Sequence, residues 1–350
     1  MPAYFEQGFF VRVPAWHGLG VVLDDYPGRE EAMRLAGHDF DIVERDLLVV
    51  GNTDAPDDFR GARAILGAKI RPVKQAGGWK AHLRSDTLDL IHVSKDTYTR
   101  IPNEVPYDFA ELLLDEGFRY ETGITLRGGA SCALTLLLDE PITVQGDDSV
   151  TLPYVGLSWA HDGSGAFRVR STSVRQVCAN TVALSEAEGK RLGTDISIRH
   201  TKNWAARIED AKKVLVGTRR DIEAYREIME QYGEIQVTPL QRDLFSQAVV
   251  LDQTVASVSR FKGDVASGAY SVRVQNNVER ETAKVKALFS GKTIPEAHRF
   301  TAYGLHLAGV EYLDHVRKYQ SQDSYVGRTL LRDEPAKARL PKLLNELVAA

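Results

Sequence analysis

The sequence predicts an α+β fold, in which a strand-rich mixed N-terminal domain over residues 1–200 is followed by a mainly helical region over residues 201–350. Two observations carry this prediction. Short apolar runs separated by Gly and Pro fill the first 200 residues, as expected of strands joined by turns. From Trp204 onward, apolar residues recur in alternating steps of four and three, which is the spacing of one helix face.

The N-terminal elements are predicted from these apolar runs and from the Gly and Pro residues that separate them. Residues 30–37 and 107–117 predict short helices, because each has apolar residues on one face and ends at a glycine. Gly77-Gly78, before the run 79–83, predicts the turn of a hairpin. Strands are predicted at residues 46–51, 62–74, 79–83 and 88–94, at two runs within 122–138 on either side of Arg127-Gly128-Gly129, and at 150–160 and 167–177.

The helical region opens with the longest periodic signal in the chain, from Trp204 to Tyr232, which predicts a helix of about four heptads. Thr238-Pro239 starts the next helix, so residues 203–260 are predicted to form a long antiparallel helical hairpin. The apolar stripe of this hairpin is either core or a contact with a second copy, so a homo-oligomer is one expectation. A polar connection is predicted at 263–280, and C-terminal helices at 300–319 and 335–348.

The composition is ordinary for a globular protein, with 43% hydrophobic and 26% charged residues among 350. No apolar run approaches the ~18 residues of a membrane-spanning helix, so no membrane partner is predicted. The N-terminus has an early acidic residue and no apolar core of a signal peptide. Two cysteines, Cys132 and Cys178, make no disulfide framework, so we expect a reducing cytoplasm.

The charge distribution is uneven. The formal net charge is −4, which argues against a general nucleic-acid coat. Between residues 165 and 220, however, twelve Lys and Arg residues face five acids, so this segment is +7 and the remainder −11. The segment predicts either an anion-binding face or an exposed helix that carries Lys and Arg for solubility.

Residues 154–182 hold the densest set of polar candidates. The turn His161–Gly165 predicts either backbone amides that hold a phosphate or a tight hairpin with good turn chemistry. Strand alternation puts Arg168 and Arg170 on one face, where guanidinium groups would track phosphates. Trp159 and Trp204 are expected to stack on bases. The residues predicted to bind nucleic acid are Arg168, Arg170, Arg175, Asn180, Lys202 and Arg207.

A catalytic interpretation depends on Cys178. This thiol would be a nucleophile only if a base such as His161 or His200 lay within reach, and a buried inert cysteine is the alternative. The histidines and cysteines lack zinc-ligand spacings such as CxxC or HExxH. No metal and no cofactor are therefore predicted.

Several local motifs occur together along almost the whole chain. They are Pro14–Gly20, Val93–Tyr98, Tyr107–Ala110, Leu126–Gly129, His161–Gly165, Val174–Thr181, Arg199–Thr201 and Glu311–His315. Together they resemble the phage/plasmid-like protein family built on domain of unknown function 932. The resemblance implies a context, a mobile genetic element in a bacterial cytoplasm, and not a reaction. Ala179 and Thr181 depart from a pattern closer to Cys-x-Asn-Gly, so the backbone geometry of that turn is not carried over.

Three functions follow as hypotheses. The first is an accessory protein of a phage or plasmid that binds single-stranded DNA and assists annealing or recombination. The second is an enzyme that acts on nucleotides or nucleic acid through Cys178, His161 or His200. The third is a non-catalytic interaction or anti-defence factor that uses the helical hairpin. The basic segment favours the first.

Overall fold

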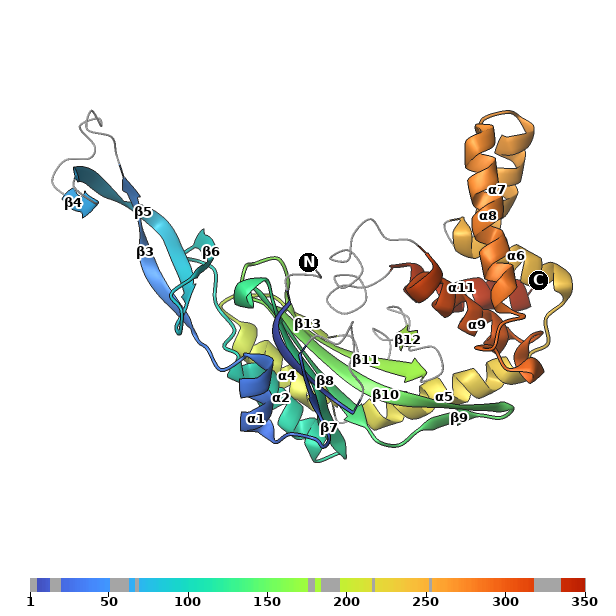
Figure 1. Cartoon of the computed structure of the whole chain (residues 1–350), viewed down its shortest axis with the longest axis horizontal. Helices are drawn as coiled ribbons and strands as arrows, with labels where there is room; N and C mark the ends of the chain where they lie inside the picture. Colours follow the sequence, from blue (N-terminus) through green and yellow to red (C-terminus); the bar gives the residue numbers. More distant parts are fainter. Residues whose placement is uncertain are drawn as a thin grey trace.

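The computed structural model describes residues 5–12, 20–50, 63–66, 69–175, 180–183, 196–215, 218–251, 254–317 and 335–349. A large sheet occupies the centre, a ribbon of strands projects from one end and helices gather at the other (Figure 1). The strand-rich part comes first in the chain, so the α+β fold predicted from the sequence is confirmed. None of the described helices is long and apolar enough to cross a membrane.

The large sheet has nine described strands, and all neighbours are antiparallel except the parallel pair at its N-terminal edge. The strands are β1 (Phe5–Val11), β2 (Val21–Leu23), β7 (Phe118–Leu126), β8 (Ser131–Leu138), β9 (Ile142–Val144), β10 (Asp147–Ala160), β11 (Phe167–Arg175), β12 (Asn180–Ala183) and β13 (Ile196–Ile198). The order across the sheet is β12-β11-β10-β8-β7-β1-β2, with β13 beside β11 and β9 beside β10. The strands expected within 122–138 and at 150–160 are confirmed as β7, β8 and β10. The strand expected at 167–177 is confirmed as β11 up to Arg175, and residues 176–177 lie outside the described part of the chain.

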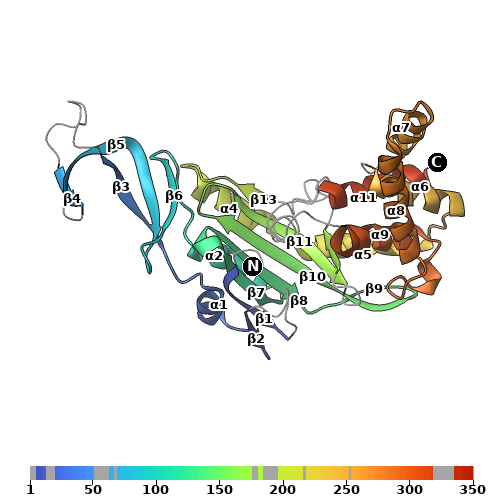
Figure 2. The same ribbon diagram turned by 45° about the horizontal axis from the view of Figure 1, so that its top comes forward.

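One face of this sheet packs against helices α1 (Arg29–Ala36), α2 (Glu104–Leu114) and α4 (Trp204–Leu215) (Figure 2). The period-two pattern of β10 explains which face this is: Val155, Leu157 and Trp159 are buried, whereas Gly156 and Ser158 between them are half-buried. Helix α1 ends because Gly37 adopts φ +69°, a left-handed conformation that closes a helix.

The ribbon, here called the β-arm, consists of β3 (Ile42–Val50), β4 (Arg63–Leu66), β5 (Lys69–Arg84) and β6 (Leu90–Lys95). The hairpin turn predicted at Gly77-Gly78 is wrong, because β5 runs straight through these glycines. Strand β3 pairs with β5 on both sides of them, and residues 76–79 lie opposite Leu47 as a bulge. Gly78, at φ +78°, supplies the conformation that this bulge requires.

The helical part differs in detail from one long hairpin. The described helices after α4 are α5 (Thr218–Glu234), α6 (Pro239–Val250), α7 (Val255–Ala266), α8 (Val272–Leu288), α9 (Ala302–Glu311) and α11 (Pro335–Val348). Helix α5 packs against α9 and β9, whereas α6 packs against α7, α8 and α11. The predicted connection at 263–280 is wrong over much of its length, because α8 begins at Val272. Two buried residues, Thr282 and Val285, anchor that helix behind a polar surface.

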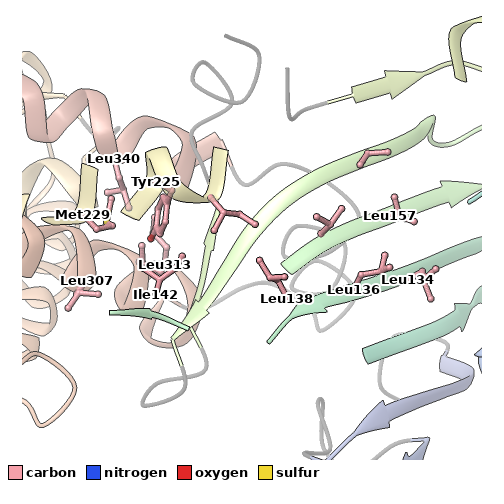
Figure 3. Packing of buried hydrophobic residues seen from close by; sticks show 14 of the residues in the cluster. Leu134, Leu136, Leu138, Ile142, Leu157, Tyr225, Met229, Leu307, Leu313 and Leu340 are labelled. Atoms are coloured by element: carbon pink, nitrogen blue, oxygen red, sulfur yellow. The ribbon is translucent and has the colours of Figure 1, made fainter. Parts of the chain in front are cut away.

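The core runs without a break from the sheet into the helices. Figure 3 shows Leu134, Leu136 and Leu157 on the strands of the large sheet, and Ile142 of β9 beside Tyr225 of α5. Helix α6 begins with a capping box, in which Thr238 accepts a hydrogen bond from the Gln241 N–H and Pro239 occupies the first turn. The helical part is therefore fixed both by local caps and by apolar contact with β9.

Candidate functional site

The turn His161–Gly165 joins β10 to β11 at one end of the large sheet. Oδ1 of Asp162 accepts a hydrogen bond from the Ser164 N–H at 2.9 Å, and Gly163 adopts φ +74°. An Arg127 Nη2 atom lies 3.4 Å from Oδ2 of the same carboxylate. Because the Asp162 carboxylate and the Ser164 amide serve the turn itself, the geometry favours the hairpin interpretation over a preformed phosphate site.

Under this turn, Asn103 organises a buried polar network. Its Oδ1 atom accepts a hydrogen bond from Nε1 of Trp159 at 2.8 Å and lies 2.7 Å from Nε2 of His161. Its Nδ2 atom donates to the Phe40 carbonyl oxygen at 2.9 Å. An indole N–H can only donate, so this contact fixes the orientation of the amide and places the His161 proton on Nε2.

His161 is only 2% exposed, and burial lowers its pKa to about 3. The ring is therefore neutral at pH 7, with a lone pair on Nδ1 that has no hydrogen-bond partner among the described residues. A general base must reach the proton of its substrate. This geometry favours a structural role for His161.

The second histidine of the catalytic hypothesis, His200, lies just before α4. Its ring stacks on Tyr98 with centroids 4.9 Å apart and planes 12° apart, and Nδ1 donates to the Thr99 carbonyl oxygen at 3.2 Å. Tyr98 also meets the rings of His82 on β5 and His92 on β6, at 5.3 and 5.9 Å between centroids. Burial lowers the pKa of both His200 and His82. A cluster of imidazole rings and a phenol thus joins the β-arm to the large sheet.

Arg168 and Arg170 lie where strand alternation predicted, on the face of the large sheet opposite α1, α2 and α4. Their neighbour Phe167 points the other way and meets Phe109 of α2, with ring centroids 5.6 Å apart. The pairing register puts Arg168 beside Ser158 and Arg170 beside Gly156. We call the half-buried set Arg168, Arg170, Ser158, Gly156 and Thr135 the arginine face.

The described residues leave open space above Gly156, at the centre of the arginine face. A Cβ atom built on Gly156 would meet, among the described residues, only the Arg170 carbonyl oxygen at 3.9 Å. Ser158 and Thr135 on either side are small. The described part of this face therefore combines two guanidinium groups with a low, polar floor.

The remaining predicted residues fall in different places. Strand pairing brings the backbones of Arg175 and Asn180 opposite each other across β11 and β12. Lys202 is exposed before α4, and Arg207 is exposed on α4, in the helix layer on the other side of the sheet from Arg168. Cys178 lies outside the described residues, so its pairing with a histidine stays a prediction. The structure thus brings together Arg168 and Arg170 but separates them from Arg207.

One expectation about side-chain chemistry has a clear outcome. The expected base-stacking role of Trp159 is wrong, because its ring is 2% exposed and its N–H is bound to Asn103. Trp204 is half-buried against the core. Among the described residues, no three His, Cys, Asp or Glu side chains are placed to hold a metal ion. Cys132 is fully buried, and burial raises the pKa of its thiol to about 12.

Sequence reasoning missed Asn103, Tyr98, His82 and His92. Asn103 occupies the N-cap position of α2, yet its side chain makes no capping bond and reaches His161, 58 positions away. Local patterns carry no signal for such a partner, because only the packing of α2 against the large sheet brings the two side chains together.

Comparison with known proteins places the chain in a family. The family model described as a domain of unknown function (DUF932) matches residues 90–334, which is more than half of the chain. No curated protein and no solved structure matches it. The matched range contains β6, the large-sheet meander from β7 to β13, and the helices up to α9. The chain therefore belongs to the family defined by this domain of unknown function.

Proposed function

We propose that the protein binds single-stranded nucleic acid along the arginine face, as an accessory protein of a phage or plasmid that assists annealing or recombination. The observation that carries this proposal is the placement of Arg168 and Arg170 on one face of a strand, on the side of the sheet opposite its helix layer. The mobile-element context comes from the sequence resemblance alone.

The spacing of the two arginines suits a chain of phosphates. Two residues apart on a strand, their Cα atoms are separated by about 6.6 Å, so the two side chains are spaced to meet different phosphates. Nε and Nη2 of Arg170 are buried, so a strand would have to reach the remainder of that guanidinium. Among the described residues, the positions directly beside them in the register are Gly156, Ser158 and Thr135, whose side chains are small. The β-sheet is also a surface on which single strands are bound in other folds.

The test is fluorescence anisotropy with a labelled single strand of about 30 nucleotides, titrated with salt. Each lost phosphate contact lowers the slope of log K against log salt by about 0.7 for single strands. Arg168→Ala with Arg170→Ala should therefore weaken binding and reduce that slope by about 1.4. Arg207→Ala on the other side of the sheet is the matched control for a lost positive charge.

The outcomes separate the hypotheses. A double variant that keeps the wild-type slope would remove the arginine face from the binding path. If Arg207→Ala alone lowers the slope as much as either arginine of the face does, the strand runs over the helix layer. If the wild-type protein binds no strand at low salt, the interaction-protein hypothesis takes its place.

A further inference from the structure

Helices α7 and α8 form a hairpin that projects from the helical part of the molecule (Figures 1 and 2). Both helices pack on α6, but they make few contacts with each other. An open cleft of about 430 Å³ lies between them. A cleft of this size is large enough to receive side chains or a ligand from another molecule.

The walls of this cleft are mainly apolar. Phe261 and Val265 of α7 line one side, and Val278 and Ala283 of α8 line the other. The side chain of Thr282 also lines the cleft; it is only 7% exposed, and its hydroxyl has no hydrogen-bond partner among the described residues. Buried polar groups are normally hydrogen-bonded, so this hydroxyl indicates a surface that another molecule completes.

The apolar surface continues beyond the cleft to the tip of the hairpin, between residues 266 and 272. Val272, 69% exposed, lies one helical turn before Gln275, which lines the cleft. The exposed ring of Tyr270 packs on Phe261, with centroids 5.1 Å apart. A small ligand in the cleft would leave these side chains in water, whereas a protein surface would cover the cleft and the tip together.

The rim of the cleft carries one charge of each sign on its two sides. Lys262 of α7 and Glu279 of α8 are both exposed, and neither has an ion-pair partner among the described residues. By contrast, Lys286 at the lower end of the cleft is bonded to Asp243. A rim of mixed sign does not attract a polyanion as a basic surface does. It is complementary to a surface that presents the same two charges in the opposite order.

A second copy of the hairpin is such a surface. Lys262 lies four residues before the end of α7 and Glu279 seven after the start of α8, so they stand roughly 6 and 10 Å from the tip. Phe261 and Val278, next to them in sequence, are level in the same way. In a two-fold pair of hairpins whose axis runs along the helices, α7 of one copy faces α8 of the other. Each Lys262 then meets a Glu279, and each Phe261 meets a Val278.

We propose that this cleft is a dimerisation surface, on which a second copy of the chain docks hairpin to hairpin to form a four-helix bundle. The longer apolar stripe from Trp204 to Tyr232 does not offer such a surface, because its Ile208, Tyr225 and Met229 are buried in the core of their own chain. The inference does not rest on nucleic-acid binding, and either proposal can fail without the other.

The experiment is sedimentation equilibrium of the full chain with the charge reversals Lys262→Glu and Glu279→Lys. Each reversal alone sets like charges together at both contacts of a two-fold dimer, so it should raise the dimer dissociation constant roughly 10-fold or more. An equimolar mixture of the two variants restores opposite charges at both contacts and should recover the wild-type dissociation constant. Arg273→Glu reverses an exposed charge on the other side of α8 and should dimerise as the wild type does.

Loss of the dimer in both single variants and its recovery in the mixture support the proposal. A wild-type protein that stays monomeric up to its solubility limit overturns it, and so does a dimer that both reversals leave intact. If the mixture stays dissociated, the two charges act within their own chain and the two-fold contact is wrong. If Arg273→Glu dissociates the dimer as strongly as Lys262→Glu, the effect is one of overall charge and the cleft is not the interface. Far-ultraviolet circular dichroism checks that each variant is folded.

Discussion

The large sheet and the β-arm are both built from antiparallel pairs, yet they place the same kind of residue differently. Trp159 of β10 is 2% exposed and hydrogen-bonded, whereas Trp79 of β5 is 43% exposed. The difference comes from the helix layer: α2 and α4 pack on the large sheet, and no described helix packs on the outer arm. An aromatic ring in the large sheet stabilises the fold, and one on the arm is available for contact.

Large truncations should expose this contrast most strongly. Trp159→Ala removes a buried indole and leaves a cavity, so it should lower the free energy of unfolding by about 3–5 kcal/mol. Trp79→Ala should cost about 1 kcal/mol or less, because much of its ring already meets water. Urea denaturation followed by circular dichroism measures both. Equal losses would mean that the arm contributes to the core as much as the sheet does.

Polar groups should show the same contrast. Asn103→Ala leaves the Trp159 N–H, the His161 N–H and the Phe40 carbonyl without their partner in the core, so it should cost about 2–4 kcal/mol. Gln75→Ala on the exposed arm should stay within about 0.5 kcal/mol. The same urea titration reports both, and a cost below about 1 kcal/mol for Asn103→Ala would contradict the network.

Some of this architecture follows directly from local sequence. Strand alternation placed Arg168 and Arg170 on one face, and the apolar runs around Arg127-Gly128-Gly129 gave β7 and β8, because these signals depend only on neighbouring residues. The Gly77-Gly78 prediction failed for a non-local reason. Two glycines look alike in a turn and in a bulge, and only the pairing of β3 across both sides selects the bulge.

The candidate site was less predictable than the fold. His161 drew attention because it stands in a polar turn. Its environment is set by Trp159, two positions earlier, and by Asn103 and Phe40, which come from two other parts of the chain. In the same way, the cluster around Tyr98 joins residues of β5, β6 and the segment before α4. Such partners depend on tertiary packing. The sequence therefore indicated where strands and turns lie, but not which side chains contact one another there.

Acid should destabilise the body of the protein through its buried histidines. Burial lowers the pKa of His306 on α9 to about 4, and its ring nitrogens have no hydrogen-bond partner among the described residues. In the unfolded chain the same histidine has a pKa near 6.5, so the unfolded state binds a proton at a higher pH than the folded state does. The stability that neutral His306 contributes to the folded state is therefore fully present above about pH 6.5 and is lost as the pH falls toward 4.

His306→Leu removes this titration without touching the Asn103 network. Between about pH 4.5 and 6, the free energy of unfolding of the variant should change with pH by about 1.4 kcal/mol per unit less than that of the wild type. Urea titrations at four pH values measure the two slopes. An arm variant such as Gln75→Ala should keep the wild-type slope, and parallel slopes for all three proteins would place the acid sensitivity elsewhere.

The smallest effect concerns the joint between the two regions. Gly163 in the turn of the large sheet and Gly78 in the arm both have left-handed backbones, at φ +74° and +78°. Replacement by alanine should cost about 1 kcal/mol at each for backbone strain. At Gly163 the new Cβ would also lie 3.2 Å from Nε2 of His92, whereas at Gly78 nothing described lies within 4 Å. Gly163→Ala should therefore cost more than Gly78→Ala.

A double-mutant cycle separates contact from strain at this joint. In a His92→Ala background the ring is absent, so Gly163→Ala and Gly78→Ala should lower the free energy of unfolding by the same amount. The difference between the two losses when His92 is present then measures the coupling between β6 and the turn. If the difference persists without His92, the extra cost at Gly163 comes from the turn and its Asp162–Ser164 hydrogen bond. In that case the arm touches the large sheet at His92 without being held there, and Tyr98 stacked on His200 is the contact that orients it.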